Sequence, residues 1–292
     1  MIKPEYLASL HKFSGFLACS DDMKFCLVNG IEQNHINIEN RGLAYGDGLF
    51  TTAKIINGKI QYLPSHVQRL LSGCKKLAIC APNQIELTEQ LSQVAKQYNL
   101  AVLKVIITAS SGGRGYARSV ELKSDIIIMV HDYPMHYEDL AIEGITLGNS
   151  KQQMGINPML SGLKHLNRLE QVLLRQELVK TKEDDLVVTN INDEVIEATS
   201  ANLFLWLNDK LCTPDITSSG VNGIMRQTVL QNYSDTLIKK VTLTELASSP
   251  AMFICNCVMG IMPVKNYNGK NLSMTLPQTV RNKLNQNETN TL

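Results

Sequence analysis

The chain has 292 residues, of which 44% are hydrophobic and 19% charged, so it can bury a core large enough for one large or two modest domains. Its 28 basic residues almost balance its 27 acidic residues, which excludes an overall field that would recruit nucleic acid or an anionic membrane. No apolar run approaches the roughly 20 residues of a membrane helix, and the N-terminus lacks a secretory signal. We therefore expect a small-molecule partner and, by default, the cytosol.

The first half of the chain has the pattern of an α+β unit. Strand-like runs lie at 24–28, 49–56, 59–63, 102–109 and 125–131, and helical patterning lies at 64–80 and 84–98. Asn57-Gly58 separates two of these runs and is a typical two-residue hairpin signal. The hairpin favours antiparallel pairing, so a doubly wound nucleotide-binding fold is disfavoured.

A second series of elements follows a boundary that we place near residue 145. Helices are expected at about 166–180 and from about 223, and strands at 185–190, 194–198, 201–207, 210–213, 238–242, 251–256 and 262–266. We thus divide the chain into domains at 24–144 and 145–285, with a polar tail at 286–292 and fraying over the last dozen residues. Residues 1–23 are expected to be an extension, although apolar residues near helical spacing leave a short docked helix open.

Seven cysteines lie mostly inside apolar runs. They stand at positions 19, 26, 74, 80, 212, 255 and 257, without a CxxC pair or a histidine cluster at zinc spacing. Buried thiols are therefore expected here, and no metal site or disulfide.

The segment from Gly220 to Arg226 combines two glycines with the start of a predicted helix. A helix N-terminus with accessible backbone amides binds an anion such as a phosphate without a basic protein around it. The amides of Gly223 and Ile224 are candidate donors, and Arg69, which flanks the apolar stripe of helix 64–80, could add a bidentate contact. The alternatives are an ordinary glycine turn and a solvated arginine.

Two charged residues suggest what such a phosphate would belong to. Lys164 lies between two short apolar runs and is a candidate Schiff-base lysine for pyridoxal phosphate. Glu197 lies on a largely apolar strand, where its carboxylate needs a cationic or hydrogen-bond-donor partner. The protonated ring nitrogen of pyridoxal phosphate would be such a partner. Keeping this nitrogen protonated makes the ring an electron sink. Thr199 and Ser200 could donate to the phosphate or could be turn residues. A solvated lysine and a strand-end glutamate exposed to water remain the alternatives.

Taken together, these motifs resemble the fold-type IV pyridoxal-phosphate enzymes, which include branched-chain and D-amino-acid aminotransferases. The segments that carry the resemblance are 41–52, 66–70, the surroundings of Lys164, 197–204 and 220–226. Within that family the resemblance is strongest to the aminodeoxychorismate lyases, and it rests on segments 48–53, 111–116, 164–171 and 254–256.

The resemblance implies an α+β fold with a smaller N-terminal α/β domain and a larger C-terminal domain whose mixed sheet forms a pseudo-barrel. It further implies that the cofactor lies between the domains and that a homodimer completes each site. By motif match Lys164 forms the aldimine and Glu197 holds the pyridine nitrogen. Arg69 and the amides of Gly223 and Ile224 bind the phosphate.

The likeness also implies a reaction, the conversion of 4-amino-4-deoxychorismate to 4-aminobenzoate and pyruvate in folate biosynthesis. Thr52 would assist the leaving oxygen, and Arg114 or Asn256 would bind substrate carboxylate or ring groups, Asn256 also serving the cofactor. Thr52 could instead be an ordinary strand residue, Arg114 a solvated loop cation, and Asn256 a strand-end backbone cap. The main alternative function is an aminotransferase on the same fold, and the second is a non-catalytic protein that binds pyridoxal phosphate.

Overall fold

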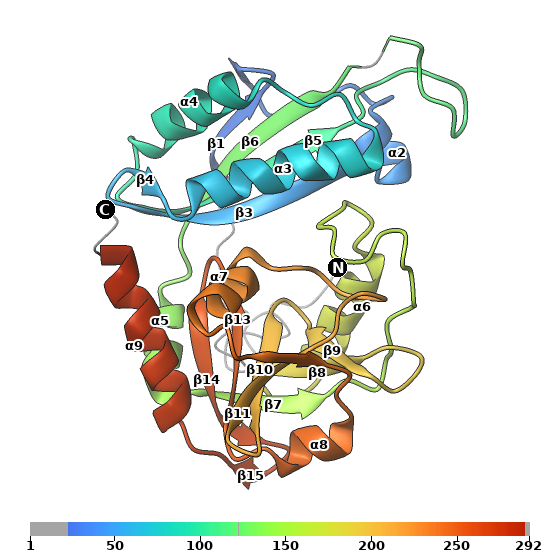
Figure 1. Cartoon of the computed structure of the whole chain (residues 1–292). Coiled ribbons are helices and arrows are strands. Elements are labelled where there is room, and N and C mark those ends of the chain that lie inside the picture. The colour runs from blue at the N-terminus through green and yellow to red at the C-terminus, as the bar shows by residue number, and fades with distance from the viewer. Residues whose placement is uncertain (1–22, 122, 290–292) are drawn as a thin grey trace, which may run out of the picture. The chain divides into compact units, whose positions relative to one another are not determined.

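The computed structural model describes residues 23–121 and 123–289, which form two compact units (Figure 1). The N-terminal unit consists of residues 23–133 together with 163–168, and the C-terminal unit of residues 134–162 together with 169–289. The chain thus leaves the N-terminal unit after Tyr133 and returns to it for a short segment that contains Lys164. The expected extension lies outside the described residues except for Met23.

The N-terminal unit is built on one antiparallel sheet with the strand order β2-β1-β6-β5-β3-β4. Its strands are β1 (Met23–Val28), β2 (Ile31–Glu32), β3 (Gly48–Ile56), β4 (Lys59–Ile60), β5 (Leu100–Thr108) and β6 (Asp125–His131). Asn57 and Gly58 join β3 to β4 with φ values of 50° and 75°, the positive values that a type I′ hairpin turn needs. The predicted antiparallel pairing is confirmed.

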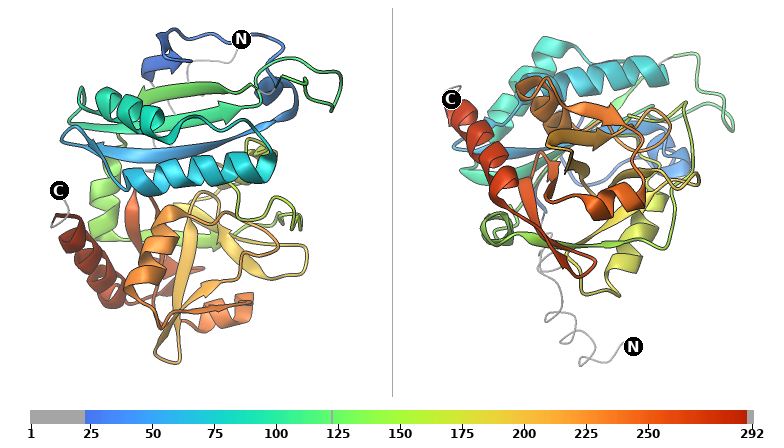
Figure 2. Two further views of the ribbon diagram at one scale, coloured as in Figure 1. Left: turned by 45° about the horizontal axis from the view of Figure 1, so that its top comes forward. Right: turned by 60° about the horizontal axis from the view of Figure 1, so that its bottom comes forward.

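Three helices accompany this sheet: α2 (Arg41–Tyr45), α3 (Leu63–Leu77) and α4 (Gln84–Ala95). Both α3 and α4 lie on the same side of the sheet (Figures 1 and 2). Alternate residues of β3, such as Leu49 and Ile55, are buried in one cluster with α3 residues such as Leu70. The intervening residues of β3, Phe50 and Thr52 among them, therefore project from the opposite face.

The C-terminal unit contains a mixed sheet in the order β12-β11-β10-β13-β14-β7-β8-β9, with β15 paired to β14. Its strands are β7 (Ile145–Asn149), β8 (Asp185–Thr189), β9 (Val195–Ala198), β10 (Asn202–Leu207), β11 (Lys210–Pro214), β12 (Leu237–Lys239), β13 (Met252–Asn256), β14 (Gly260–Tyr267) and β15 (Lys270–Asn271). Strand β9, at one end of this order, also contacts β10 and β11 near the other end, so the sheet curls on itself. The expected α+β class and the pseudo-barrel are confirmed.

Within its described residues this unit has five helices: α5 (His136–Glu143), α6 (Leu169–Leu178), α7 (Ile224–Asn232), α8 (Leu243–Ser248) and α9 (Thr275–Thr289). Helix α9 continues to Thr289, so part of the segment expected to be frayed is helical, and Val280 and Leu284 are buried at helical spacing. Over residues 23–121 and 123–289, no helix combines the length and apolarity that a membrane crossing requires.

Candidate active site

Lys164 is held in an extended segment against the start of β3. The amide of Phe50 donates to the carbonyl of Lys164 at 2.9 Å, and the amide of Leu166 donates to the carbonyl of Gly48 at 3.0 Å. These bonds fix the backbone on both sides of the lysine. Its Nζ lies 4.6 Å from the centroid of the Phe50 ring, on the face of β3 that also carries Thr52. The structure therefore brings the candidate lysine and the candidate hydroxyl to the same face of one strand.

His66 on α3 is a buried residue to which the sequence motif assigned no role. Its Nδ1 lies 2.6 Å from Thr51 Oγ1, whereas its Nε2 is buried and finds no hydrogen-bond partner among the described residues. Burial, followed by the positive charges of Arg69 and Lys164, lowers the pKa of His66 to about 3. The ring is therefore neutral at physiological pH.

The three basic side chains His66, Arg69 and Lys164 form a set that suits an anion. Arg69 follows His66 on the same helix and is half-buried, and both cations act on the buried imidazole. When the Thr51 hydroxyl donates to Nδ1, the ring proton sits on Nε2 and requires an acceptor. A phosphate oxygen would satisfy that N–H and the neighbouring cations together.

The buried state of His66 predicts how stability varies with pH. The folded pKa of about 3 lies below the unfolded value of 6.5, so the unfolded chain binds more protons between them. The free energy of unfolding should therefore fall as pH drops below 6.5, with a slope from His66 of up to about 1.4 kcal/mol per pH unit. Urea titrations from pH 7 to 4.5 should give a shallower slope for His66→Asn. The exposed His35 supplies the control, and an equally shallow slope for His35→Asn would contradict the assignment.

Arg114 lies at the exposed tip of the loop between β5 and β6. It exchanges two backbone hydrogen bonds of 3.1 Å with Ala117. The buried Arg41 holds this loop, since its guanidinium donates to the carbonyls of Gly115 and Tyr116, each at 3.1 Å. The loop is thus anchored close to its tip, and the role of Arg114 toward a substrate stays a prediction.

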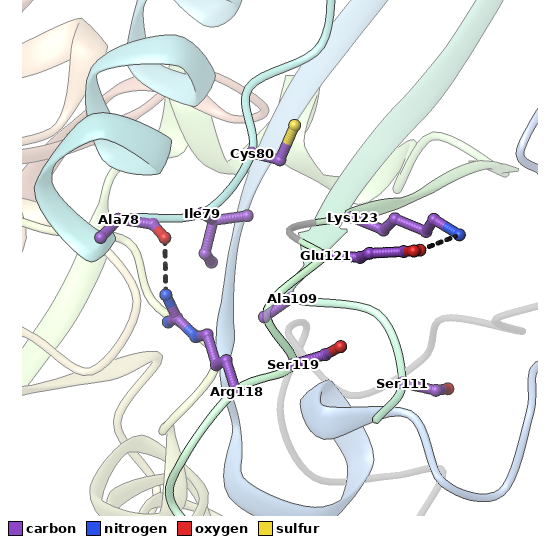
Figure 3. A pocket seen from close by; sticks show the side chains of 9 residues that line it. All are labelled: Ala78, Ile79, Cys80, Ala109, Ser111, Arg118, Ser119, Glu121 and Lys123. Atoms are coloured by element: carbon purple, nitrogen blue, oxygen red, sulfur yellow. Dashed lines mark hydrogen bonds and ion pairs between the residues drawn. The ribbon is translucent and has the colours of Figure 1, made fainter. Parts of the chain in front are cut away.

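A small pocket of the N-terminal unit lies beside this loop (Figure 3). Arg118 lines it but is already engaged, donating to the Ala78 carbonyl at 2.7 Å and pairing with Asp47. The pocket's other charged side chains, Glu121 and Lys123, pair with each other at 3.1 Å. None of the residues predicted to act on a cofactor or substrate lines this pocket, so we do not place the site there.

In the C-terminal unit, Glu197 of β9 is buried, and two donors bind one of its carboxylate oxygens. Its Oε2 accepts from the Val221 amide at 3.0 Å and from Asn202 Nδ2 at 3.3 Å. Only 5% of the residue is exposed, which excludes the alternative of a water-exposed glutamate at a strand end. A buried carboxylate with this orientation can serve a cationic ligand atom such as a protonated ring nitrogen.

The predicted anion loop lies where α7 begins. Gly223 is the N-cap, and no side chain of the described residues caps the helix. The amide of Gly223 donates to Asn202 Oδ1 at 3.1 Å, so it is already used within the protein. The first-turn amides of Ile224 and Met225 have no acceptor among the described residues, and they are the ones that suit a phosphate oxygen.

Asp185 ties down the turn that follows Glu197. The amide and hydroxyl of Thr199 donate to Asp185 Oδ1 at 3.1 and 2.5 Å, and the Ser200 hydroxyl approaches Oδ2 at 3.5 Å. Burial raises the pKa of the Asp185 carboxyl, although the hydrogen bond from Thr199 and the charge of Arg175 oppose this. Thr199 is thus engaged with the protein, while Ser200 remains exposed.

Asn256 ends β13 with its side chain turned toward the backbone. Its Oδ1 accepts from the amides of Val258 and Met259 at 2.9 and 3.0 Å, and its Nδ2 donates to the Ser200 carbonyl at 3.2 Å. These contacts are those of the backbone cap that the sequence left open. A direct contact to cofactor or substrate stays a prediction.

Comparisons with known proteins bear on both units. Residues 48–267 match the model of the amino-transferase class IV family. An aminodeoxychorismate lyase of Vibrio harveyi is 33% identical over 86% of this chain and 94% of that protein. A putative branched-chain-amino-acid aminotransferase of Methanocaldococcus jannaschii is 26% identical over 80% of this chain and 83% of that protein.

Solved structures show the same architecture. The crystal structure of 4-amino-4-deoxychorismate lyase from Pseudomonas aeruginosa matches with a TM-score of 0.85 and 32% identity, covering 89% of this chain and 98% of that one. A PLP-bound hypothetical aminotransferase from Mycobacterium tuberculosis matches with a TM-score of 0.79 at 13% identity, covering 90% and 98%. The second likeness shows the fold alone.

Proposed function

This chain belongs to the amino-transferase class IV family, and we propose that within it the chain is a pyridoxal-phosphate-dependent aminodeoxychorismate lyase. The observation that carries the proposal is the similarity of this chain to two aminodeoxychorismate lyases, which extends over nearly the whole length of this chain and of each lyase. The candidate residues support it, because the chain supplies a lysine, a buried carboxylate and two groups of phosphate donors.

The proposed reaction converts 4-amino-4-deoxychorismate to 4-aminobenzoate and pyruvate, a step of folate biosynthesis. A proton leaves the ring carbon that bears nitrogen, and the bond from the neighbouring ring carbon to the enolpyruvyl oxygen breaks. The ring becomes aromatic, and the departing enolpyruvate takes up a proton to become pyruvate. The proton lost by the ring carbon is thus matched by the proton that enolpyruvate gains. Pyridoxal phosphate, when bound, supplies an electron sink for the charge left by the first proton.

Five residues are assigned to the cofactor. Lys164 would bind the aldehyde, and Arg69 with His66 would bind the phosphate. The Ile224 amide would add a phosphate donor, and Glu197 would bind the ring nitrogen. The donor set fits the group, since it offers cations and N–H donors to the anionic end and a carboxylate to the cationic end.

Other residues of the chain move the proton or hold the substrate. The Lys164 amine takes the proton from the ring carbon, and the Thr52 hydroxyl, on the same face of β3, donates to the leaving oxygen. Arg114 is assigned to a substrate carboxylate. Thr199, Ser200 and Asn256 support the cofactor site through the turn they form with one another and with Asp185.

The proposal includes a homodimer. Three apolar residues at helical spacing form an exposed stripe on one side of α6. They are Leu169, Val172 and Leu173, with exposed fractions of 70%, 52% and 48%. An apolar stripe of this kind is typical of a surface that another chain covers. A cytoplasmic location is also proposed, and the described cysteines, which are reduced and mostly buried, agree with a reducing compartment.

Product analysis tests the function directly. The purified protein with pyridoxal phosphate and 4-amino-4-deoxychorismate should release pyruvate and 4-aminobenzoate in equal amounts. A parallel reaction with D-alanine and 2-oxoglutarate measures transamination. Amino-group transfer without release of 4-aminobenzoate would replace the lyase by an aminotransferase on the same fold.

Cofactor affinity should depend on Arg69. Changing Arg69 to Ala removes charge-assisted phosphate contacts, which are worth about 1.5–3 kcal/mol, so the dissociation constant should rise about 10- to 150-fold. Titration of the visible absorbance with pyridoxal phosphate measures this. Lys75 is exposed on the same helix, and Lys75→Ala is the control that should bind as the wild type does. Unchanged affinity in Arg69→Ala would show that this guanidinium does not bind the phosphate.

A further inference from the structure

One buried amide side chain holds together the carboxylate and the loop that bind opposite ends of the proposed cofactor. Asn202 is the first residue of β10 and is 5% exposed. Its Nδ2 donates to Glu197 Oε2 at 3.3 Å and to the Val221 carbonyl at 2.8 Å, while its Oδ1 accepts from the Gly223 amide at 3.1 Å. Both N–H groups and the carbonyl of this amide are therefore engaged.

The loop is also fastened to the carboxylate directly. The Val221 amide donates to the same Glu197 oxygen at 3.0 Å, so Glu197, Asn202 and Val221 form a closed triangle of hydrogen bonds. The third contact of Asn202, to Gly223, extends the triangle to the N-cap of α7. Moving any member strains the others, because a buried polar group that loses its partner is costly.

The two glycines of the loop show how closely these groups are packed. A Cβ on Gly223 would lie 2.1 Å from Asn202 Oδ1, although the backbone of Gly223 has an ordinary φ of −63°. A Cβ on Gly220 would lie 2.6 Å from Ile196 Cγ2 and 3.3 Å from Glu197 Oε2. Asn202 leaves no room for a side chain at Gly223. Gly220 combines the close approach of the Glu197 strand with a φ of 88°, which favours glycine.

We propose that Asn202 is the positioning residue that sets the spacing between the ring-nitrogen carboxylate and the phosphate-binding amides. Asn202 thereby couples the binding of the two ends of the cofactor without touching either. The assignment of those ends rests on the proposed function. Asparagine suits this task since it offers a donor to Glu197 and an acceptor to Gly223, whereas aspartate would place a second carboxylate beside Glu197.

The test compares pyridoxal phosphate with pyridoxal, which is the same aldehyde without the phosphate. Binding of each to the full chain is measured by equilibrium dialysis for wild type, Asn202→Ala and Thr213→Val. Thr213 is the matched control, because it is a fully buried polar residue of the next strand whose hydroxyl donates to the Leu203 carbonyl at 2.8 Å.

Asn202→Ala should weaken both ligands, pyridoxal phosphate by about tenfold or more, as expected for losing a buried hydrogen bond to a charged group. Thr213→Val should leave both affinities as they are. Weakening of pyridoxal phosphate alone would overturn the proposal, since Asn202 would then serve only the loop, and unchanged binding of both would overturn it outright. Failure of the wild type to bind either ligand would instead reject the proposed function.

Two further measurements exclude a merely structural effect. Asn202→Asp keeps the side-chain shape and the acceptor for Gly223 but loses both donors, so it should still weaken pyridoxal if Asn202→Ala does not fold. The pH at which the visible band of the bound cofactor titrates should shift in Asn202→Ala, because a displaced Glu197 favours the ring-nitrogen proton less and so lowers the pKa of that nitrogen. A titration midpoint equal to that of the wild type would contradict the role.

Discussion

Replacing Lys164 with Ala should abolish the yellow colour of the protein with pyridoxal phosphate and lower the rate of pyruvate release by at least about 1,000-fold. The loss is large because this lysine is proposed both to bind the aldehyde and to carry the proton. Borohydride treatment of the wild type, followed by peptide mass mapping, should place the reduced cofactor on Lys164. The same treatment should leave the variant unlabelled.

Lys104 provides a demanding control for that experiment. Its Nζ lies 5.4 Å from the centroid of the same Phe50 ring that Lys164 approaches at 4.6 Å. Lys104 also pairs with Thr52 across β3 and β5, so it shares the surroundings of the proposed anchor. Lys104→Ala should keep the colour and the label. A label on Lys104 in the wild type would show that the lysine that binds the cofactor is Lys104 of β5.

Changing Gly223 to Ala should nearly abolish cofactor binding while the rest of the fold survives. The new Cβ would meet Asn202 Oδ1 at 2.1 Å, and the loop must shift to relieve the overlap. The amide of Ile224 follows directly, so the phosphate donors move with it. We expect at least a 100-fold higher dissociation constant, as for a lost group of charge-assisted contacts, measured by absorbance titration.

The control for this variant is Gly155→Ala. A Cβ on Gly155 would approach only the flexible end of Glu170, at 3.2 Å, so binding should be unaffected. Combining Gly223→Ala with Asn202→Ala removes the clashing atom. The double variant should bind the cofactor no more weakly than Asn202→Ala alone, and a further loss would show that the clash is not with Asn202.

Local patterns in the sequence were sufficient for most of the architecture. The Asn57-Gly58 dipeptide specified a hairpin because few other residue pairs accept two positive φ values. The apolar stripe of α3 predicted its buried face, and the family motifs brought Lys164, Arg69 and Glu197 forward as a set. Such features depend on neighbours in the chain, which a sequence displays directly.

What the sequence could not show depends on contacts between distant segments. Helix α9 is polar overall, and its buried Val280 and Leu284 are recognisable only once β14 is there to receive it. The orphaned nitrogen of His66 and the three contacts of Asn202 concern single atoms. His66 precedes Arg69 by three residues, which places the two side chains next to each other on α3. This spacing was the one feature of the sequence that could have pointed to His66 as a site residue.

The return of residues 163–168 to the N-terminal unit has a consequence for synthesis on the ribosome. Until this segment emerges, the first residues of β3 have an unpaired edge, the kind of surface that recruits other chains. Some 30 residues separate Tyr133 from this segment, a delay of roughly 2–6 s at ordinary elongation rates of about 5–20 residues per second. The nascent chain therefore passes through an interval in which its first unit cannot be completed, and a chaperone that covers the start of β3 would act within it.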